Sequence, residues 1–465
     1  MNNQKIRIKE LICILILLLS FGTNAQELKR KASLGIAMAP MTDSIAIANN
    51  AEKGIGIHIP KVWSNSTASN LGMKNGAILT KINGHEINNI RMLISEIENL
   101  LADDKISMTY YQDGKSNTKQ TKAIARPLEE FDQANIYYNQ VDYDGNQLRS
   151  ILYTPKDVKN PPVVYFLQGY VCETTEFANA PEFTIKKLIN DWVLAGFAVY
   201  RVEKPGMGDS QCDKGCMDLD FNEEVEGFRQ GYLSLQKNPL IDHENIFLFG
   251  HSMGGIVAPI LANEFKPKGL ITYGIIINTW FEYMQEMSRV HGELFSVPFA
   301  EIERDVRRSI PFWYDLLMTN KTNLEILENE TIRGILEEEG ILEDFKAGYF
   351  MDRHYTYWQT LNKISLIDTW LAVESNVLAI YGEYDIEALN ANHVKTIAAV
   401  VNSTHPGKGS YQIIPKADHG FVHFESMEEN IASHNSGEYG RRLRDSYHDG
   451  VAKSTVKWMN ELIKN

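Results

Sequence analysis

The sequence predicts an α/β protein with a mixed, mostly parallel sheet and a helical insertion, preceded by a small α+β domain. From residue 135 onward, short apolar runs of strand type alternate with stretches of helical periodicity. Before residue 127, short β-type runs are separated by Asn-Gly and Asp-Gly turns. A chain of 465 residues, 44% hydrophobic and 23% charged, suggests about three domains of ordinary globular composition.

Residues 1–25 have the features of a secretory signal peptide. Lys5, Arg7 and Lys9 form a basic region, residues 11–21 are apolar, and residues 23–25 end in a small residue suited to cleavage. The apolar stretch is short for a bilayer span, which favours cleavage over the alternative, an uncleaved anchor. We therefore expect an exported protein, periplasmic or secreted, with no membrane span in the mature chain.

Charge and residue spacing limit the ligands and partners. The formal net charge of −14 disfavours nucleic acid and anionic lipid as partners. Histidines and cysteines with the spacing of metal ligands are absent from the sequence. We therefore expect no metal and no organic cofactor.

The first domain is expected over residues 30–126. Its β-type runs lie at residues 56–59, 77–82 and 106–111, and apolar residues recur at helical spacing between residues 92 and 101. Residues 126–130 then read as a short linker.

The centre of this domain, residues 68–79 followed by 82–87, resembles PDZ domains. In that family a loop of alternating glycine and apolar residues offers backbone amides to the C-terminal carboxylate of a peptide, which then adds a strand to the sheet. The matching residues here are Gly54, Ile55, Gly56 and Ile57. The resemblance implies a peptide partner. The alternative is a domain that only packs against or gates the following domain.

The second domain is expected over residues 135–465. It opens with a hairpin of residues 136–142 and 148–153, joined at an Asp-Gly-Asn turn. Strands of buried type follow at 163–167, 197–202, 246–249, 270–277, 377–381 and 411–414. Helical stretches are expected near 182–195, 222–236, 254–264, 388–400 and 440–463. This alternation predicts helices on both faces of the sheet.

Residues 281–375 interrupt the alternation with a helical insertion between two of the parallel strands. Ligands bind at the carboxyl ends of the strands in open α/β folds, and this insertion is expected there. We therefore interpret it as a lid over an active site. The alternative is an insertion without a role in the site.

The sequence Gly250-His251-Ser252-Met253-Gly254 lies between an apolar strand and an apolar helix. Glycines at both ends of this pentapeptide allow the sharp turn that exposes a nucleophilic serine. The first helical N–H groups then face the reacting centre, where negative charge develops. Ser252 is therefore the candidate nucleophile.

Strand, serine turn, acid and histidine follow one another in the order of the α/β-hydrolase fold, and residues 135–465 resemble that family. The family places its acid three residues after a glycine that ends a buried strand, which selects Asp385, with Glu383 and Glu387 as competitors. Asp385 is also a sensible helix N-cap. His419, which follows the last strand, corresponds to the base, with His405 and His423 as rivals.

The resemblance also implies an oxyanion hole. One donor is the backbone N–H of Met253, next to the nucleophile, and the second is expected in the loop after residues 163–167, where we select Tyr170. This chain has Gln168-Gly169 where many relatives have His-Gly. The Gly-x-Gly-x-Ser stretch at residues 206–210 is interpreted as a structural turn beside the site and not as a dinucleotide fingerprint.

Three cysteines remain after removal of a signal peptide: Cys172, Cys212 and Cys216. In an oxidising compartment, one disulfide and one free thiol are the simplest arrangement, and a zinc site would lack a fourth ligand. A Cys172–Cys216 bridge would hold the oxyanion loop against its neighbour. The alternative, Cys212–Cys216, would only close a small loop.

These residues predict an exported serine hydrolase that cleaves carboxylic esters through an acyl-enzyme. A peptidase of the prolyl-oligopeptidase-like branch is the alternative that uses the same triad, although residues 26–134 are too few for that branch's β-propeller. A third alternative is a PDZ adaptor whose hydrolase domain is inactive.

Overall fold

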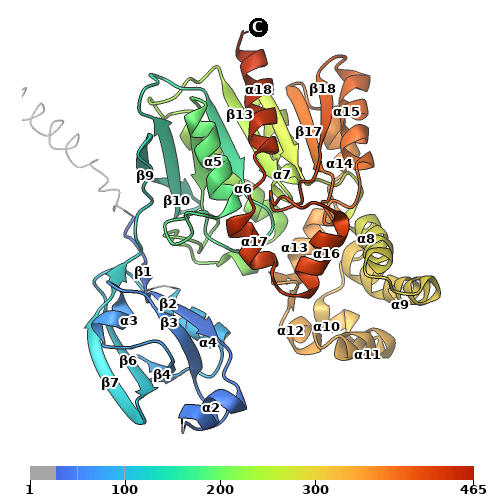
Figure 1. Ribbon diagram of the computed structural model, residues 1–465. Coiled ribbons are helices and arrows are strands. Elements are labelled where there is room, and N and C mark those ends of the chain that lie inside the picture. The colour runs from blue at the N-terminus through green and yellow to red at the C-terminus, as the bar shows by residue number, and fades with distance from the viewer. Residues whose placement is uncertain (1–27, 50, 99, 465) are drawn as a thin grey trace, which may run out of the picture.

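The structure is a computed structural model that describes residues 28–49, 51–98 and 100–464 (Figure 1). The expected signal peptide, residues 1–25, lies outside the described residues. Of the helices in the described residues, none combines the length and the apolar character that crossing a membrane requires.

An eight-stranded mixed sheet forms the centre of the larger domain. Its order across the sheet is β18-β17-β14-β13-β11-β12-β10-β9, and all neighbours are parallel except around β10, which is antiparallel to both β9 and β12. The strands, in chain order, are β9 (Ala134–Tyr143), β10 (Asn146–Pro155), β11 (Val163–Leu167), β12 (Ala198–Val202), β13 (Ile246–His251), β14 (Gly269–Tyr273), β17 (Asn376–Gly382) and β18 (Gly409–Ile414).

Helices cover both faces of this sheet, as the strand–helix alternation predicts (Figure 1). One apolar core lies between the sheet and helices α5 (Thr184–Leu194) and α18 (Gly450–Lys464). A second core includes α6 (Phe221–Leu235), α7 (Gly254–Phe265) and α15 (Asn392–Thr404). The predicted fold class, an α/β-hydrolase sheet with a helical insertion after a small α+β domain, is confirmed.

The helix expected near 388–400 is α15, residues 392–404, and two further expected elements differ in where they end or break. Strand β14 ends at Tyr273 and not at 277, because Gly274 has a φ of 69°, which turns the chain out of the extended conformation. The expected helix 440–463 is two helices, α17 (Tyr439–Asp445) and α18. Between them Tyr447 forms a β-bridge with Val422, so tertiary pairing interrupts the helical pattern.

The insertion between β14 and β17 is mainly helical. In Figure 1, α8, α9 and α11 extend beyond the lower right edge of the sheet. Its elements are α8 (Trp280–Leu294), α9 (Phe299–Met318), α10 (Asn323–Ile326), α11 (Glu330–Glu338), α12 (Leu342–Lys346), β15 (Tyr349–Phe350), β16 (Arg353–His354), α13 (Tyr355–Asn362) and α14 (Leu366–Leu371).

The small domain contains a second sheet of order β2-β3-β4-β6-β7, with β5 (His85–Glu86) paired to β4. Three helices, α2 (Asp43–Asn49), α3 (Thr67–Asn70) and α4 (Ile90–Ile97), accompany it. The strands are β2 (Ile36–Ala39), β3 (Ile57–Val62), β4 (Ala77–Ile82), β6 (Lys105–Gln112) and β7 (Lys115–Lys122).

This sheet corrects the expected peptide site at Gly54–Ile57. That loop leads into β3, which pairs with β2 on one side and with β4 on the other. A peptide therefore cannot add a strand beside β3, because both of its edges are taken. Strand β2, which was not among the strands expected from the sequence, lies at this edge of the sheet.

Both ends of the small domain are attached to the larger one. A short pair of strands, β1 (Ala32–Ser33) and β8 (Ile124–Ala125), closes the small domain where it joins the other. The Arg30 guanidinium donates to the carboxylates of Asp209 (2.5 Å) and Glu176 (2.8 Å). Glu129, in the linker, is buried between Lys186 and Arg201. The two domains are thus joined by buried ion pairs.

Candidate active site

Ser252 occupies the sharp turn between β13 and α7 with a φ of 53°, in the left-handed region. The flanking glycines are required sterically: a Cβ on Gly250 would lie 2.4 Å from the Gly254 carbonyl oxygen, and one on Gly254 would lie 2.1 Å from that of Leu167. The N–H of Ser252 donates to the Tyr273 carbonyl (2.9 Å). The strained turn places Ser252 in the wall of a cavity at the end of the sheet.

His419 and Asp385 form a hydrogen-bonded pair in the same region. The His419 Nδ1 atom lies 3.0 and 2.9 Å from the two Asp385 carboxylate oxygens. Asp385 is fully buried just after β17, and its Oδ1 also accepts the N–H groups of Glu387 (2.9 Å) and Ala388 (2.8 Å). The carboxylate therefore orders its own turn and orients the histidine. His419 and Ser252 both line the cavity.

The charge of Asp385 changes the basicity of His419. Burial by itself would lower the pKa of His419, but the adjacent carboxylate and its hydrogen bond favour the imidazolium and raise the pKa to about 9. A histidine in this setting strongly attracts a proton released by a neighbouring hydroxyl group. With this pKa the imidazolium form of His419 predominates at neutral pH, and the ring must first lose that proton to solvent before it can act as a base.

Gly274 allows the pair to sit close to the backbone. A Cβ at this position would lie 2.7 Å from the His419 ring and 3.0 Å from Asp385 Oδ2. Because β14 ends at Tyr273, directly before Gly274, the backbone that follows this strand is in contact with the His419 ring.

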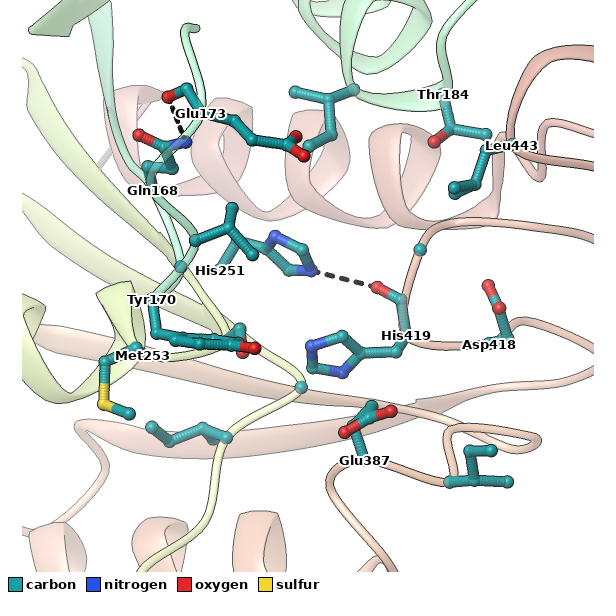
Figure 2. Close-up of a pocket in the computed structure, with 18 of the residues that line it drawn as sticks. Gln168, Tyr170, Glu173, Thr184, His251, Met253, Glu387, Asp418, His419 and Leu443 are labelled. Carbon is teal, nitrogen blue, oxygen red and sulfur yellow. Dashed lines mark hydrogen bonds between the residues drawn. The ribbon is translucent and has the colours of Figure 1, made fainter. Parts of the chain in front are cut away.

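His251 is a site residue that the sequence analysis did not identify. Its Nε2 donates to the His419 carbonyl oxygen (2.9 Å), as Figure 2 shows. Burial lowers the pKa of His251 to about 3, so the ring is neutral and carries its proton on Nε2. His251 thereby connects the turn that bears Ser252 with the loop that bears His419. The sequence does place His251 directly before Ser252, and this position is the feature that could have indicated a role in the site.

The loop after β11 lies over the nucleophile. A Cβ on Gly169 would be 3.1 Å from Ser252 Cβ, so the loop backbone is in contact with Ser252. Tyr170 and Met253 lie on the same side of the cavity (Figure 2). Within the described residues, the N–H groups of Tyr170 and Met253 have no hydrogen-bond partner. Gln168 donates to the Glu173 carbonyl (2.9 Å) and so closes the loop on itself.

The structure pairs Cys172 with Cys216 and leaves Cys212 as a free thiol. Cys216 begins a short 3-10 helix, Cys216–Asp218, after the Gly-x-Gly-x-Ser turn. The disulfide therefore joins the loop over Ser252 to the segment that follows β12.

The cavity has a volume of about 390 Å³, within the range of small-molecule sites. The insertion supplies much of its aromatic wall through Trp280, Tyr283 and Trp358. Acidic side chains, including Glu173 and Glu387 (Figure 2), are part of the lining, whereas lysine and arginine are absent from it among the described residues. The site therefore suits an apolar substrate, with acidic groups at hand for a positive charge.

Of the competing residues, Glu387 lines the cavity, whereas Glu383, His405 and His423 lie outside its lining. Glu383 is exposed and accepts the N–H of Lys416 (2.9 Å). His405 follows the last residue of α15, and His423 pairs with Glu425 (3.1 Å) outside the cavity lining.

Throughout the described ranges, no group of three or more histidine, cysteine or acidic side chains could hold a metal ion.

A family model described as serine aminopeptidase, S33, matches residues 183–329. The matched part contains Ser252 but ends before Asp385 and His419. It thus supports a hydrolase at the serine turn without covering the rest of the candidate triad.

Curated relatives match in the N-terminal region, where the PDZ-like domain lies. A probable periplasmic serine protease do/HhoA-like from Haemophilus influenzae is 32% identical over 96 residues, 21% of this chain and 21% of that protein. The periplasmic serine endoprotease DegP of Salmonella typhimurium is 24% identical over 108 residues, 23% of each chain. The matches span about a fifth of these relatives' length.

Solved structures resemble the chain over most of its length at low identity. Est1E from Butyrivibrio proteoclasticus is 15% identical with a TM-score of 0.41, covering 70% of this chain and 99% of that one. Proline iminopeptidase from Mycobacterium smegmatis is 15% identical with a TM-score of 0.39, covering 70% and 98%.

Proposed function

We propose that the protein is a serine hydrolase that cleaves carboxylic esters through an acyl-enzyme, with Ser252, His419 and Asp385 as its triad. The observation that carries this proposal is the position of Ser252 and of the His419–Asp385 pair in the walls of one apolar cavity. The family match over residues 183–329 supports a hydrolase.

In the proposed mechanism, Ser252 Oγ attacks the ester carbonyl while His419 Nε2 takes the hydroxyl proton. Asp385 stabilises the resulting imidazolium. The N–H groups of Tyr170 and Met253 stabilise the oxyanion, and His419 then gives the proton to the leaving alcohol. Water hydrolyses the acyl-enzyme by the same steps in the same order. The insertion acts as a lid that excludes water and shapes the acyl pocket.

A second candidate, an aminopeptidase, is favoured by the acidic lining. Glu387 and Glu173 could pair with the ammonium group of a substrate, and the family match carries an aminopeptidase description. A panel of neutral p-nitrophenyl esters and aminoacyl p-nitroanilides separates the two candidates. We expect kcat/KM to be at least tenfold higher for the esters.

Glu387→Gln sharpens that comparison. If the amide substrates bind through Glu387, this variant will raise their KM about tenfold or more and leave the KM of neutral esters unchanged. Glu383→Gln, at an exposed carboxylate outside the cavity, is the matched control. Higher kcat/KM on aminoacyl amides, together with that change in KM, would replace the esterase proposal with the aminopeptidase.

We also propose that the PDZ-like domain binds peptide C-termini along the edge of β2. Strand β2 is at the edge of its sheet, and Gly35, directly before it, has a φ of 65°, in the left-handed region that favours glycine. In a fluorescence-anisotropy titration of the full chain, peptides ending in a free carboxylate should bind at least tenfold more tightly than their amidated forms. Equal affinity for the free and the amidated peptides would favour the alternative, a domain that only packs against the larger domain. Binding without ester turnover would instead favour an adaptor.

Export is the third part of the proposal. It is supported by the basic and apolar residues of segment 1–25 and by the partial similarity to periplasmic proteases. A disulfide between Cys172 and Cys216 suits an oxidising compartment.

A further inference from the structure

Buried cations hold the backbone of the loop over Ser252 from behind. Lys204 Nζ donates to the carbonyl oxygens of Gly169 (2.5 Å) and Val171 (3.3 Å). The carbonyl between them, that of Tyr170, accepts from Arg353, whose Nε lies 3.0 Å away and whose Nη2 also donates to it. Three consecutive carbonyl groups are thus bound by two side chains from distant parts of the chain.

A single carboxylate holds these two cations together. Glu224 Oε2 lies 3.2 Å from Lys204 Nζ and 2.5 Å from Arg353 Nη2. Lys204, Glu224 and Arg353 expose only 2%, 1% and 0% of their surfaces. Buried charges are costly unless they are paired, and the three lie in a cluster at the oxyanion loop. Arg353 also donates to the Cys216 carbonyl (2.7 Å), which links the cluster to the disulfide.

The direction of the Gly169 carbonyl determines where the next N–H points. No peptide bond among the described residues is cis, so the Gly169 C=O and the Tyr170 N–H point in opposite directions. Strand β11, which leads into this loop, lies between β12, which precedes Lys204, and β13, which leads to Ser252. A carbonyl drawn toward the β12 side turns the following N–H toward the β13 side.

We propose that Lys204, together with Arg353, is a positioning residue that aims the Tyr170 N–H at the oxyanion formed on Ser252. This inference rests on the proposed function, since it concerns the oxyanion hole of that same site. Neither side chain lines the cavity, so both act through the backbone of the loop. Because Arg353 belongs to the insertion, the insertion also takes part in setting the hole.

The test is Lys204→Met, which keeps the apolar stem and removes the ammonium group. We expect kcat on a neutral ester to fall about 10- to 100-fold with KM within about twofold, because a misdirected donor weakens only transition-state binding. The affinity for a trifluoromethyl ketone, whose adduct with Ser252 carries an oxyanion, should fall by a similar factor. A purely structural role would not link these two losses.

Lys186→Met is the matched control, because Lys186 is also buried and paired, with Glu129, but contacts no carbonyl of the loop over Ser252. It should cost thermal stability and leave kcat within about twofold. If Lys204→Met does not fold, Lys204→Gln replaces it. The shorter, neutral amide should give an intermediate loss of both kcat and inhibitor affinity.

The outcomes separate this inference from the function on which it rests. Wild-type kcat and inhibitor affinity in a folded Lys204→Met or Lys204→Gln variant would overturn the positioning role, as would equal losses in Lys186→Met. Ester turnover that survives in Ser252→Ala would instead overturn the proposed function.

Discussion

Ser252→Ala is expected to lower kcat on every ester that the wild type cleaves by on the order of 10⁴- to 10⁶-fold. Without the hydroxyl group no acyl-enzyme forms, and only the oxyanion donors and substrate binding remain. Alanine is close in size to serine, so the turn at this position should keep its conformation. Turnover of p-nitrophenyl esters, together with labelling by a fluorophosphonate probe, measures the loss directly.

The matched control is Ser375→Ala. Ser375 is also buried, and its hydroxyl donates to the Pro267 carbonyl (2.7 Å), but it precedes β17 and lies outside the cavity lining. We expect this variant to lose some stability and to keep wild-type kcat and probe labelling. More than about one per cent of wild-type kcat in Ser252→Ala would exclude Ser252 as the nucleophile.

The residues with a local signature could be predicted from the sequence. The pentapeptide around Ser252 is required by sterics, since Cβ atoms on its two glycines would collide with backbone. Asp385 follows β17, a buried strand of the kind most visible in a sequence, whereas His419 follows β18, an edge strand whose residues Tyr411, Gln412 and Ile413 are exposed. Their pairing at 2.9 Å follows from the neighbouring positions of β17 and β18.

What the sequence could not reveal depends on tertiary contacts. Strand β2 is four residues long and only partly buried, so it has no strand pattern of its own, and the sequence alone does not show that it pairs with β3, the strand into which Gly54–Ile57 leads. A lysine or an arginine in a sequence is normally expected at the surface, and the residues around Lys204 and Arg353 do not indicate that Glu224 pairs with both in the interior. His251 becomes a link only once the His419 loop folds over it.

Asp385→Asn has the second largest expected effect, a fall in kcat of about 10⁴-fold with the fold intact. Asp385 Oδ1 accepts two backbone N–H groups, from Glu387 and Ala388. An asparagine oxygen must keep that position, which leaves the amide NH₂ facing His419 Nδ1. Nδ1 then becomes the acceptor, and the ring proton moves to Nε2, where it prevents the histidine from accepting the serine proton.

The pH profile of kcat/KM distinguishes this change from simple loss of structure. In the wild type, kcat/KM should rise up to about pH 9, because His419 must be neutral to act as a base and its pKa is raised to about 9. Without the carboxylate, burial dominates and favours the neutral ring, so the residual activity should reach its plateau at lower pH. Asp191→Asn, at a half-buried carboxylate on α5 that accepts the Tyr447 hydroxyl (2.8 Å) and lies outside the cavity lining, should leave the profile unchanged. An unshifted profile in Asp385→Asn would show that another group sets the basicity of His419.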